Sequence, residues 1–208
     1  MCVFLRIQKP GLKYIFVPGF CIFTLQKLTE MKKTYLASII LLLLTITCFS
    51  QDINKVEYSE RAGNMILIGE CNRDAFTMEP FLEWYDMEYE EYTPDQIIIE
   101  KLKKDINNVS RIKIVMGSWC SDSQREVPRF YRIMDEAGIP DEKVELISVN
   151  RDKMVPGIDI SALKIERVPT FIIYDGIKEL GRIIETPVET LEEDLLRILV
   201  NKPLHEPE

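Results

Sequence analysis

Histidine is almost absent from this sequence, and cysteine and glycine are scarce: 208 residues include one histidine, five cysteines and nine glycines. So few soft ligands give no basis for a zinc cluster, which takes four cysteine or histidine side chains. No glycine-rich phosphate loop and no internal repeat is present. The acidic residues between Glu83 and Glu91 lack the Asp/Asn spacing of a calcium loop. We therefore predict neither a metal nor a cofactor.

Positive charge is also in deficit. The chain carries 26 Lys and Arg against 34 Asp and Glu, whereas a nucleic-acid binder needs a basic face to displace counterions from phosphates. The deficit is uneven, because residues 1–50 hold six of the basic residues and one acidic residue. Residues 51–208 therefore hold 20 basic and 33 acidic residues, a net charge of −13. The sequence argues against nucleic acid as a partner, and it consists of two unlike parts.

The N-terminal part has the layout of a secretory signal. A short positive segment that begins at Met31 precedes an apolar stretch, and the small residues Cys48 and Ser50 lie at positions −3 and −1 before Gln51. The apolar stretch is shorter than the ~20 residues of a membrane-spanning helix. We therefore predict an upstream extension over 1–30 and a signal peptide over 31–50.

Two alternatives stay open for this segment. Lipoprotein processing at Cys48 would anchor the mature chain through a lipid, and an uncleaved leader would itself be a membrane anchor. In each case we expect export to the periplasm or cell envelope, an oxidising compartment where disulfide chemistry is possible. Membrane association is expected only through the leader or the lipid.

Cysteine usage becomes simple once the leader is set aside. Three cysteines fall within residues 1–50, and Cys71 and Cys120 remain. Two cysteines do not make a disulfide scaffold, so either one has a special role or both are inert. The single histidine, His205, lies near the C-terminus, where we expect it to be solvated and not to pair with a cysteine.

The remaining residues alternate between short apolar runs and amphipathic segments, which predict strands and helices respectively. Their order predicts one compact α/β domain over 61–202, with a flexible segment over 51–60 and a frayed tail over 203–208. The predicted strands cover 65–68, 111–116, 144–149, 170–174 and 180–184. The predicted helices cover 76–92 with a break at Pro80, 94–108 with Thr93 as N-cap, 121–137, and about 188–199.

The chemistry of the chain is concentrated at Met116–Ser123. Cys120 falls between a predicted strand and a predicted helix, where the helix dipole and free backbone N–H groups can stabilise a thiolate. Trp119 can shield one side of the sulfur and offer a partner an apolar surface. Ser123 lies one helical turn further on and can donate a hydrogen bond to the sulfur. These three residues are the predicted catalytic group.

The segment resembles the thioredoxin-like family, whose hallmark is Trp-Cys-x-x-Cys at such a junction. A second stretch, Arg167–Gly176, resembles the family's loop and hairpin, and Pro128 matches the proline of its active-site helix. The resemblance covers about 109–200 and implies a three-layer α/β/α fold with a central mixed sheet. It also implies a cis peptide bond at Pro169 and a substrate-binding surface made by Val168, Pro169 and Trp119, with strand-like pairing at Val168.

The sequence departs from the family pattern at two positions. Ser123 stands where dithiol members have a resolving cysteine, so a mixed disulfide on Cys120 has no internal thiol to release it. Ile114 stands where many thioredoxins bury an acid that relays protons. Beside the sulfur, Asp122 would oppose a thiolate, whereas Arg125 and Arg129 would favour it.

Three functions are compatible with these residues. The leading hypothesis is a monothiol exchange protein that forms mixed disulfides with, or isomerises, exported proteins or peptides through Cys120. The second is a redox-inactive module that uses the surface of Trp119 and Pro169 to hold a partner. The third is peroxide sensing through a sulfenate. Cys71 is either an ordinary cysteine or the missing resolving residue, for which its Cα would have to lie within ~7 Å of that of Cys120.

Overall fold

The computed structural model describes residues 53–105 and 109–200. The predicted extension, signal peptide and tail, with Cys48 and His205, lie outside the described residues. Within the described part, no helix is long and apolar enough to cross a membrane.

The elements in chain order are β1 (Val56–Ser59), β2 (Asn64–Leu67), β3 (Gly69–Cys71), η1 (Arg73–Thr77), α2 (Leu82–Glu91), α3 (Gln96–Asp105), β4 (Arg111–Met116), α4 (Ser121–Ala137), η3 (Asp141–Lys143), β5 (Val144–Ser148), η4 (Ser161–Leu163), β6 (Thr170–Asp175), β7 (Lys178–Ile184) and α5 (Leu191–Leu199).

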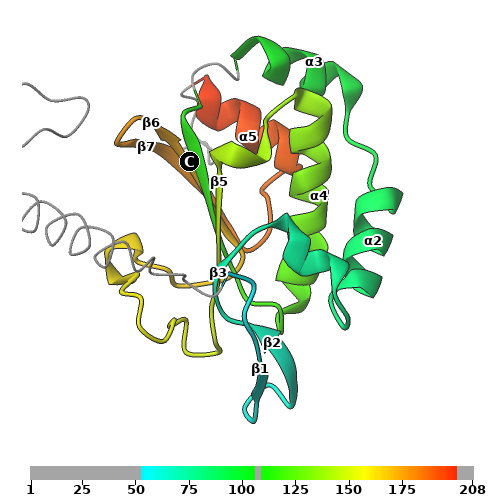
Figure 1. The fold of residues 1–208 in the computed structure, drawn as a ribbon. Helices are drawn as coiled ribbons and strands as arrows, with labels where there is room; N and C mark the ends of the chain where they lie inside the picture. Colours follow the sequence, from blue (N-terminus) through cyan, green and yellow to red (C-terminus); the bar gives the residue numbers. More distant parts are fainter. Residues whose placement is uncertain (1–52, 106–108, 201–208) are drawn as a thin grey trace, which may run out of the picture. The chain divides into compact units, whose positions relative to one another are not determined.

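A five-stranded mixed sheet forms the centre of the domain (Figure 1). Its strand order is β3-β5-β4-β6-β7. The neighbours β4 and β5 run parallel, and the other neighbouring pairs run antiparallel. Ile112, Ile114 and Met116 of the middle strand β4 are fully buried on one face of the sheet. The predicted α/β class with a mixed central sheet is confirmed.

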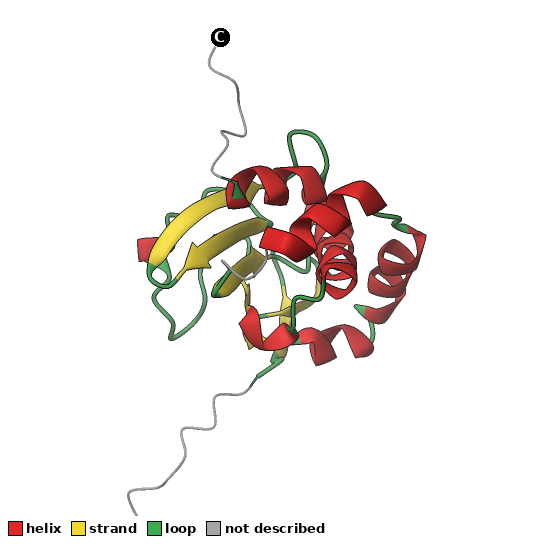
Figure 2. Ribbon diagram, turned by 90° about the horizontal axis from the view of Figure 1, so that it is seen from above, coloured by secondary structure: helices red, strands yellow, loops and turns green. Residues whose placement is uncertain are grey.

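Helices cover the first face of this sheet. α4 packs against α2, α3 and α5, and Phe130 of α4 stacks on Phe171 of β6 with 4.4 Å between ring centroids. Figure 2 shows these helices gathered on one side of the sheet. On the second face, residues 149–169, with the 3-10 helix η4, cover the end of β4 and pack on Val115 and Ile147. The predicted three-layer arrangement is therefore confirmed.

α4 has the bounds that the sequence predicts. It begins directly after Cys120, continues through Pro128 and ends at Gly138. Gly138 has a φ of 77°, the left-handed conformation in which many helices end. The helix thus fixes Cys120 at its N-terminus and buries its apolar side in the core.

Residues 56–59 form strand β1 within the segment that we predicted to be flexible. β1 pairs antiparallel with β2, and Tyr58 lies opposite Met65. The last residue of β2, Leu67, is held through its backbone: its N–H donates to Ser118 Oγ (2.9 Å), and its carbonyl accepts from Ser148 Oγ (2.8 Å). β1 therefore forms because long-range hydrogen bonds fix its partner strand, which the polar composition of 51–60 does not reveal.

The N-terminus of α3 is capped by Asp95 and not by Thr93 as predicted. Asp95 Oδ1 accepts from the N–H of Ile97 at 2.7 Å, and the Asp95 N–H donates to Glu192 Oε1 at 2.9 Å. The Tyr92 hydroxyl donates to Glu192 Oε2 at 2.6 Å. The buried carboxylate of Glu192 thus holds the chain between α2 and α3, and this tertiary contact shifts the helix start.

Candidate functional site

The Cys120 thiol lies at the N-terminus of α4. Cys120 is the N-cap residue, with an extended backbone (φ −99°, ψ 125°), and its carbonyl accepts from the Gln124 N–H at 2.9 Å. The side chain is partly exposed, and its Sγ lies 3.4 Å from the carbonyl oxygen of Val168. Two of the predicted site residues, 48 positions apart in the chain, are therefore in contact.

The loop that carries Val168 is fixed on both sides of that residue. The Val168–Pro169 bond is cis, the isomer that the resemblance implies. The carbonyl of Pro169 accepts from the Glu185 N–H at 2.7 Å, and the Thr170 hydroxyl donates to the Arg167 carbonyl at 2.7 Å. These bonds hold the Val168 carbonyl in place against the cysteine.

Trp119 is held at its ring nitrogen and on its ring face. Its Nε1–H donates to the carbonyl of Val149 at 2.8 Å, and the guanidinium carbon of Arg151 lies 4.7 Å from the ring centroid. A β-carbon at Gly117 would come within 2.6 Å of the ring, so only glycine leaves it room. The ring face beneath Arg151 is consequently not part of the apolar surface that the sequence led us to expect.

Ser123 is fully buried beneath the loop between β4 and α4. Its hydroxyl accepts a hydrogen bond from the N–H of Gly117 at 3.2 Å. A side chain in the first turn of α4 can face the end of β4, where Gly117 offers a backbone donor. Accepting this bond leaves the hydroxyl proton free, so the predicted donation from Ser123 to the Cys120 sulfur stays a prediction.

The charged residues near Cys120 are engaged with one another. Arg125 contacts Asp122 at 2.9 Å and the buried Glu126 at 2.7 Å. Arg129, which we expected to favour a thiolate, contacts Glu88 at 2.6 Å. Both arginines therefore form ion pairs with carboxylates on α4 and α2.

Cys71 does not bridge to Cys120, and both cysteines are free. Cys71 in β3 lies opposite Leu146 of β5, which lies opposite Ile114 of β4. Two strand spacings of about 4.8 Å put Cys71 roughly 10 Å from β4, and Cys120 lies further still, beyond the end of that strand. Since a disulfide requires Cα atoms within about 7 Å, Cys71 is not placed to be a resolving cysteine.

Burial of Cys71 makes the stability of the domain sensitive to alkaline pH. Desolvation raises the pKa of its thiol from 9.0 to about 12, so the folded state disfavours the thiolate. The contribution of the protonated Cys71 thiol to the free energy of unfolding is complete below pH 9. It is lost as the pH rises towards 12, at up to about 1.4 kcal/mol per pH unit. We expect urea unfolding between pH 9 and 10 to show this slope in the wild type and in Cys120→Ala, and a shallower one in Cys71→Ala. Equal slopes of unfolding free energy against pH in all three proteins would show that the Cys71 thiol does not cause the loss of stability.

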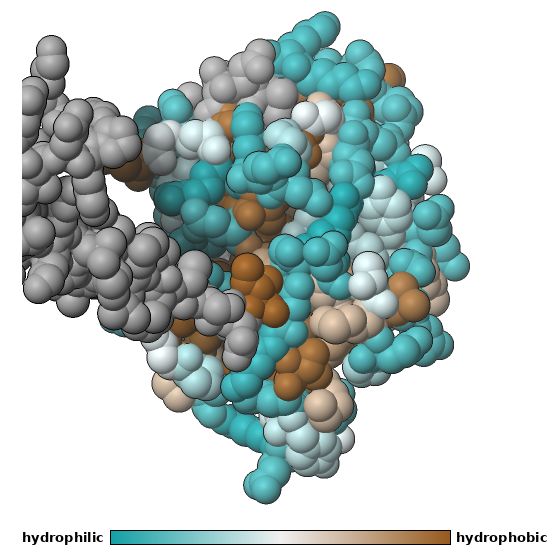
Figure 3. Space-filling view, in the orientation of Figure 1, coloured by the Kyte–Doolittle hydropathy of each residue, from teal (hydrophilic) through white to brown (hydrophobic). Residues whose placement is uncertain are grey.

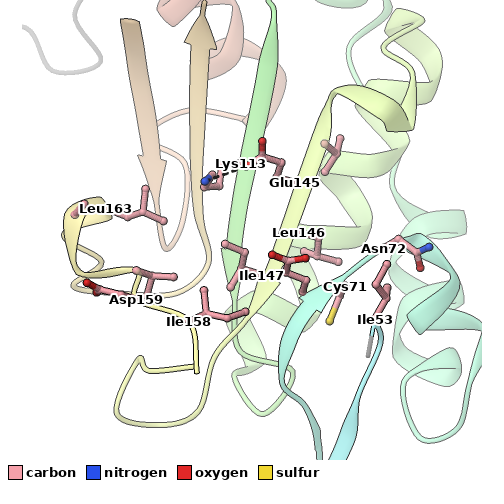
Figure 4. A pocket seen from close by; sticks show the side chains of 14 residues that line it. Ile53, Cys71, Asn72, Lys113, Glu145, Leu146, Ile147, Ile158, Asp159 and Leu163 are labelled. Atoms are coloured by element: carbon pink, nitrogen blue, oxygen red, sulfur yellow. Dashed lines mark ion pairs between the residues drawn. The ribbon is translucent and has the colours of Figure 1, made fainter. Parts of the chain in front are cut away.

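A cavity of about 660 Å³ lies on the second face of the sheet, between its β3–β5–β4 edge and η4 (Figure 4). Cys71 lines it, and so does the ion pair of Lys113 with Glu145 (2.9 Å), but Trp119 and Cys120 do not. Figure 3 shows a mainly hydrophilic surface with small separate hydrophobic patches. Among the described residues, no group of three or more His, Cys, Asp or Glu could hold a metal ion. The candidate thiol is thus an open surface site outside this cavity.

Sequence reasoning missed Ser118, Val149 and Arg151, which contact the hairpin strand β2 or the Trp119 ring. The sequence did contain a signal for Val149 and Arg151. β4 and β5 are parallel neighbours, and the carboxyl ends of such strands meet at one edge of a sheet. Residues just after 144–148 were therefore candidates for contact with the loop after 111–116.

Comparison with known proteins gives no family for this chain: no family model and no curated protein matches it. Among solved structures, it is similar to a crystal structure of an HIV epitope-scaffold, with 19% identity, a TM-score of 0.44, and coverage of 66% of this chain and 86% of that one. It is also similar to the crystal structure of a protein of unknown function from Pseudomonas aeruginosa, with 18% identity, a TM-score of 0.44, and coverage of 64% and 82%.

Proposed function

We propose that this chain is an exported thioredoxin-like protein that exchanges thiols and disulfides through Cys120. The observation that carries the proposal is the position of the Cys120 sulfur: partly exposed, at the N-terminus of α4, and 3.4 Å from the Val168 carbonyl. Backbone N–H groups at a helix N-terminus favour a negatively charged sulfur, which is the nucleophile in disulfide exchange. The leader supports export, and with it an oxidising compartment.

Exchange through a single cysteine takes two steps. The Cys120 thiolate attacks one sulfur of a partner's disulfide; a new S–S bond forms, the old one breaks, and the second partner sulfur leaves as a thiolate that takes a proton from solvent. A thiolate of the partner then attacks the mixed disulfide and frees Cys120, which isomerises the partner without net oxidation. An external thiol can take the same role, and it then becomes part of the new disulfide.

The surroundings of Cys120 suit an extended polypeptide as the partner. The backbone N–H of Val168 has no hydrogen-bond partner among the residues that the structure describes, which leaves a donor for strand-like pairing, although the residue itself is only 4% exposed. Beside this loop lies a hollow of about 490 Å³, lined by Arg167, Pro187 and Val188 among others, with room for a partner side chain. We therefore propose exported proteins or peptides with thiols or disulfides as partners.

Intact-mass measurement of the purified full chain with a disulfide-containing model peptide tests the proposal. We expect a peptide adduct at Cys120, located by peptide mapping, on the wild type and on Cys71→Ala, and none at position 120 in Cys120→Ser. A wild type that stays unmodified, or a Cys120→Ser protein that is modified equally, would refute exchange through Cys120. Because Cys71 is buried, its replacement is the matched control for loss of a thiol outside the site.

A partner-binding module without redox activity is the second candidate. The contact between Cys120 Sγ and the Val168 carbonyl favours it, because an S–H group can donate this bond and a thiolate cannot. In that case the peptide would bind to the Cys120→Ser protein as well as to the wild type, with no covalent adduct on either.

A further inference from the structure

Arg151 is the cation that lies against the site loop. It follows β5 by three residues, and its guanidinium carbon lies 4.7 Å from the centroid of the Trp119 ring, next in sequence to Cys120. The carbonyl of Val149, two residues before it, holds the ring nitrogen of the same tryptophan. Stacking uses the flat face of a guanidinium and leaves the N–H donors at its edge available.

The charge of Arg151 is not compensated within the described part of the chain. Its contact there is the Trp119 ring, with no hydrogen bond or ion pair to another described residue. The other described arginines, with Arg197 set aside because it has interactions of its own, are all in ion pairs with carboxylates. Arg151 therefore differs from them in having both a fixed position and free donors.

The carboxylates on the neighbouring segments are largely neutralised. Asp152 pairs with Arg61 and Glu185 pairs with Arg167, while Asp122 shares Arg125 with the buried Glu126. Two further exposed carboxylates lie within residues 149–169: Glu166 acts on Arg167 electrostatically, and Asp159 accepts from the Ser161 N–H. Arg151 is thus a cation with no carboxylate partner among the described residues, in a part of the chain whose net charge over residues 51–208 is −13.

We propose that Arg151 determines the specificity of the site by selecting partners that carry a carboxylate close to the reacting sulfur. A guanidinium presents forked donors that match the two oxygens of a carboxylate. The Debye length is about 8 Å at physiological ionic strength, so salt screens the more distant acidic residues of the domain. The preference of the site for a charged partner is therefore set by the nearby cation. This inference rests on the exchange function proposed above.

Rates of mixed-disulfide formation with three small disulfides test it in the full chain. The reagents are anionic 3,3′-dithiodipropionate, neutral bis(2-hydroxyethyl) disulfide and cationic cystamine. For Arg151→Ala we expect the anionic-to-neutral rate ratio to fall roughly threefold to tenfold, as the loss of one contact between unit charges in water implies. Arg151→Glu should lower the ratio further and raise the cystamine rate, and 1 M salt should abolish the wild-type preference.

Lys178→Ala is the matched control, because it removes the same charge from the β6–β7 turn at the far end of the sheet. It should leave the ratio within about twofold of the wild type, as the distant charge is screened. Equal loss of rate for all three reagents in Arg151→Ala would overturn the proposal, since it would mean that Arg151 only positions Trp119. An unchanged ratio would overturn it as well.

Failure of the exchange function itself would show up separately, as a Cys120 that reacts with none of the three reagents. Binding to the non-reacting Cys120→Ser protein then decides the role of Arg151. Titration with dithiodipropionate should shift the indole N–H resonance of Trp119, assigned with Trp119→Phe, and Arg151→Ala should weaken this binding by the same threefold to tenfold. No shift with the anion, or the same shift with cystamine, would refute the inference.

Discussion

Ser123→Cys is expected to give the domain a reversible internal disulfide with Cys120 and at least roughly a tenfold gain in steady-state reduction of a model disulfide by an external dithiol. Position 123 lies in the first turn of α4, three residues after the N-cap cysteine, and its side chain is buried beneath the loop. A thiol there can attack the mixed disulfide on Cys120 and release the partner without waiting for a second molecule. Turnover with dithiothreitol, and a thiol count before and after mild oxidation, measure the two effects.

Ser121→Cys is the matched control for this gain. It also places a second thiol in the first turn of α4, but adjacent to Cys120 in the chain, where a disulfide would strain the intervening backbone. We expect no rise in turnover for this variant. A Ser123→Cys protein that loses no thiols on oxidation, or a gain as large in Ser121→Cys, would show that position 123 is not placed to resolve the mixed disulfide.

Glu192→Ala is expected to lower the free energy of unfolding by about 3 kcal/mol. The carboxylate is 2% exposed and accepts from the Tyr92 hydroxyl at 2.6 Å and from the Asp95 N–H at 2.9 Å. Its removal leaves two donors without this acceptor, at about 1–3 kcal/mol each. Burial and the adjacent carboxylate also raise the pKa of Tyr92, so that hydroxyl keeps its proton and needs an acceptor. Urea unfolding at pH 7 gives the comparison.

Glu193→Ala provides the control in the same turn of α5. Glu193 is partly exposed, so its loss should change the free energy of unfolding by less than about 0.5 kcal/mol. Glu192→Gln keeps the size of the side chain and one acceptor oxygen, and should fall between the alanine variant and the wild type. Similar losses for Glu192→Ala and Glu193→Ala would mean that the two hydrogen bonds do not carry the effect.

Local patterns in the sequence were sufficient for the elements that carry the candidate site. The alternating, β-branched residues at 111–116 and the glycine at 138 predicted β4 and the end of α4, because both depend on residues close together in the chain. The pairing of Cys120 with Val168 came from the family resemblance, and the contact between them agrees with it. Strand order was not accessible in this way, and it decides that Cys71 lies on the edge strand β3, away from the site.

Polar residues were the main source of error. Glu192 belongs to an acidic first turn of α5, and its carboxylate is buried against Tyr92, which the charge pattern does not reveal. The N-cap of α3 was expected at Thr93, and Asp95 takes that place. In both cases the hydrogen-bond partner depends on how the elements pack, which neither residue spacing nor composition predicts.

The hydrogen bonds of Leu67 set the order in which the site can be completed during synthesis. They join Leu67 to Ser118 and Ser148 across 51 and 81 residues, and the Val168 carbonyl reaches Cys120 across another 48. A chain that emerges N-terminus first exposes Cys120 well before the strands and loop that surround it are available. Until residue 168 has emerged, the cysteine is an ordinary thiol on an unfinished chain, and the surface that would select its partners does not yet exist.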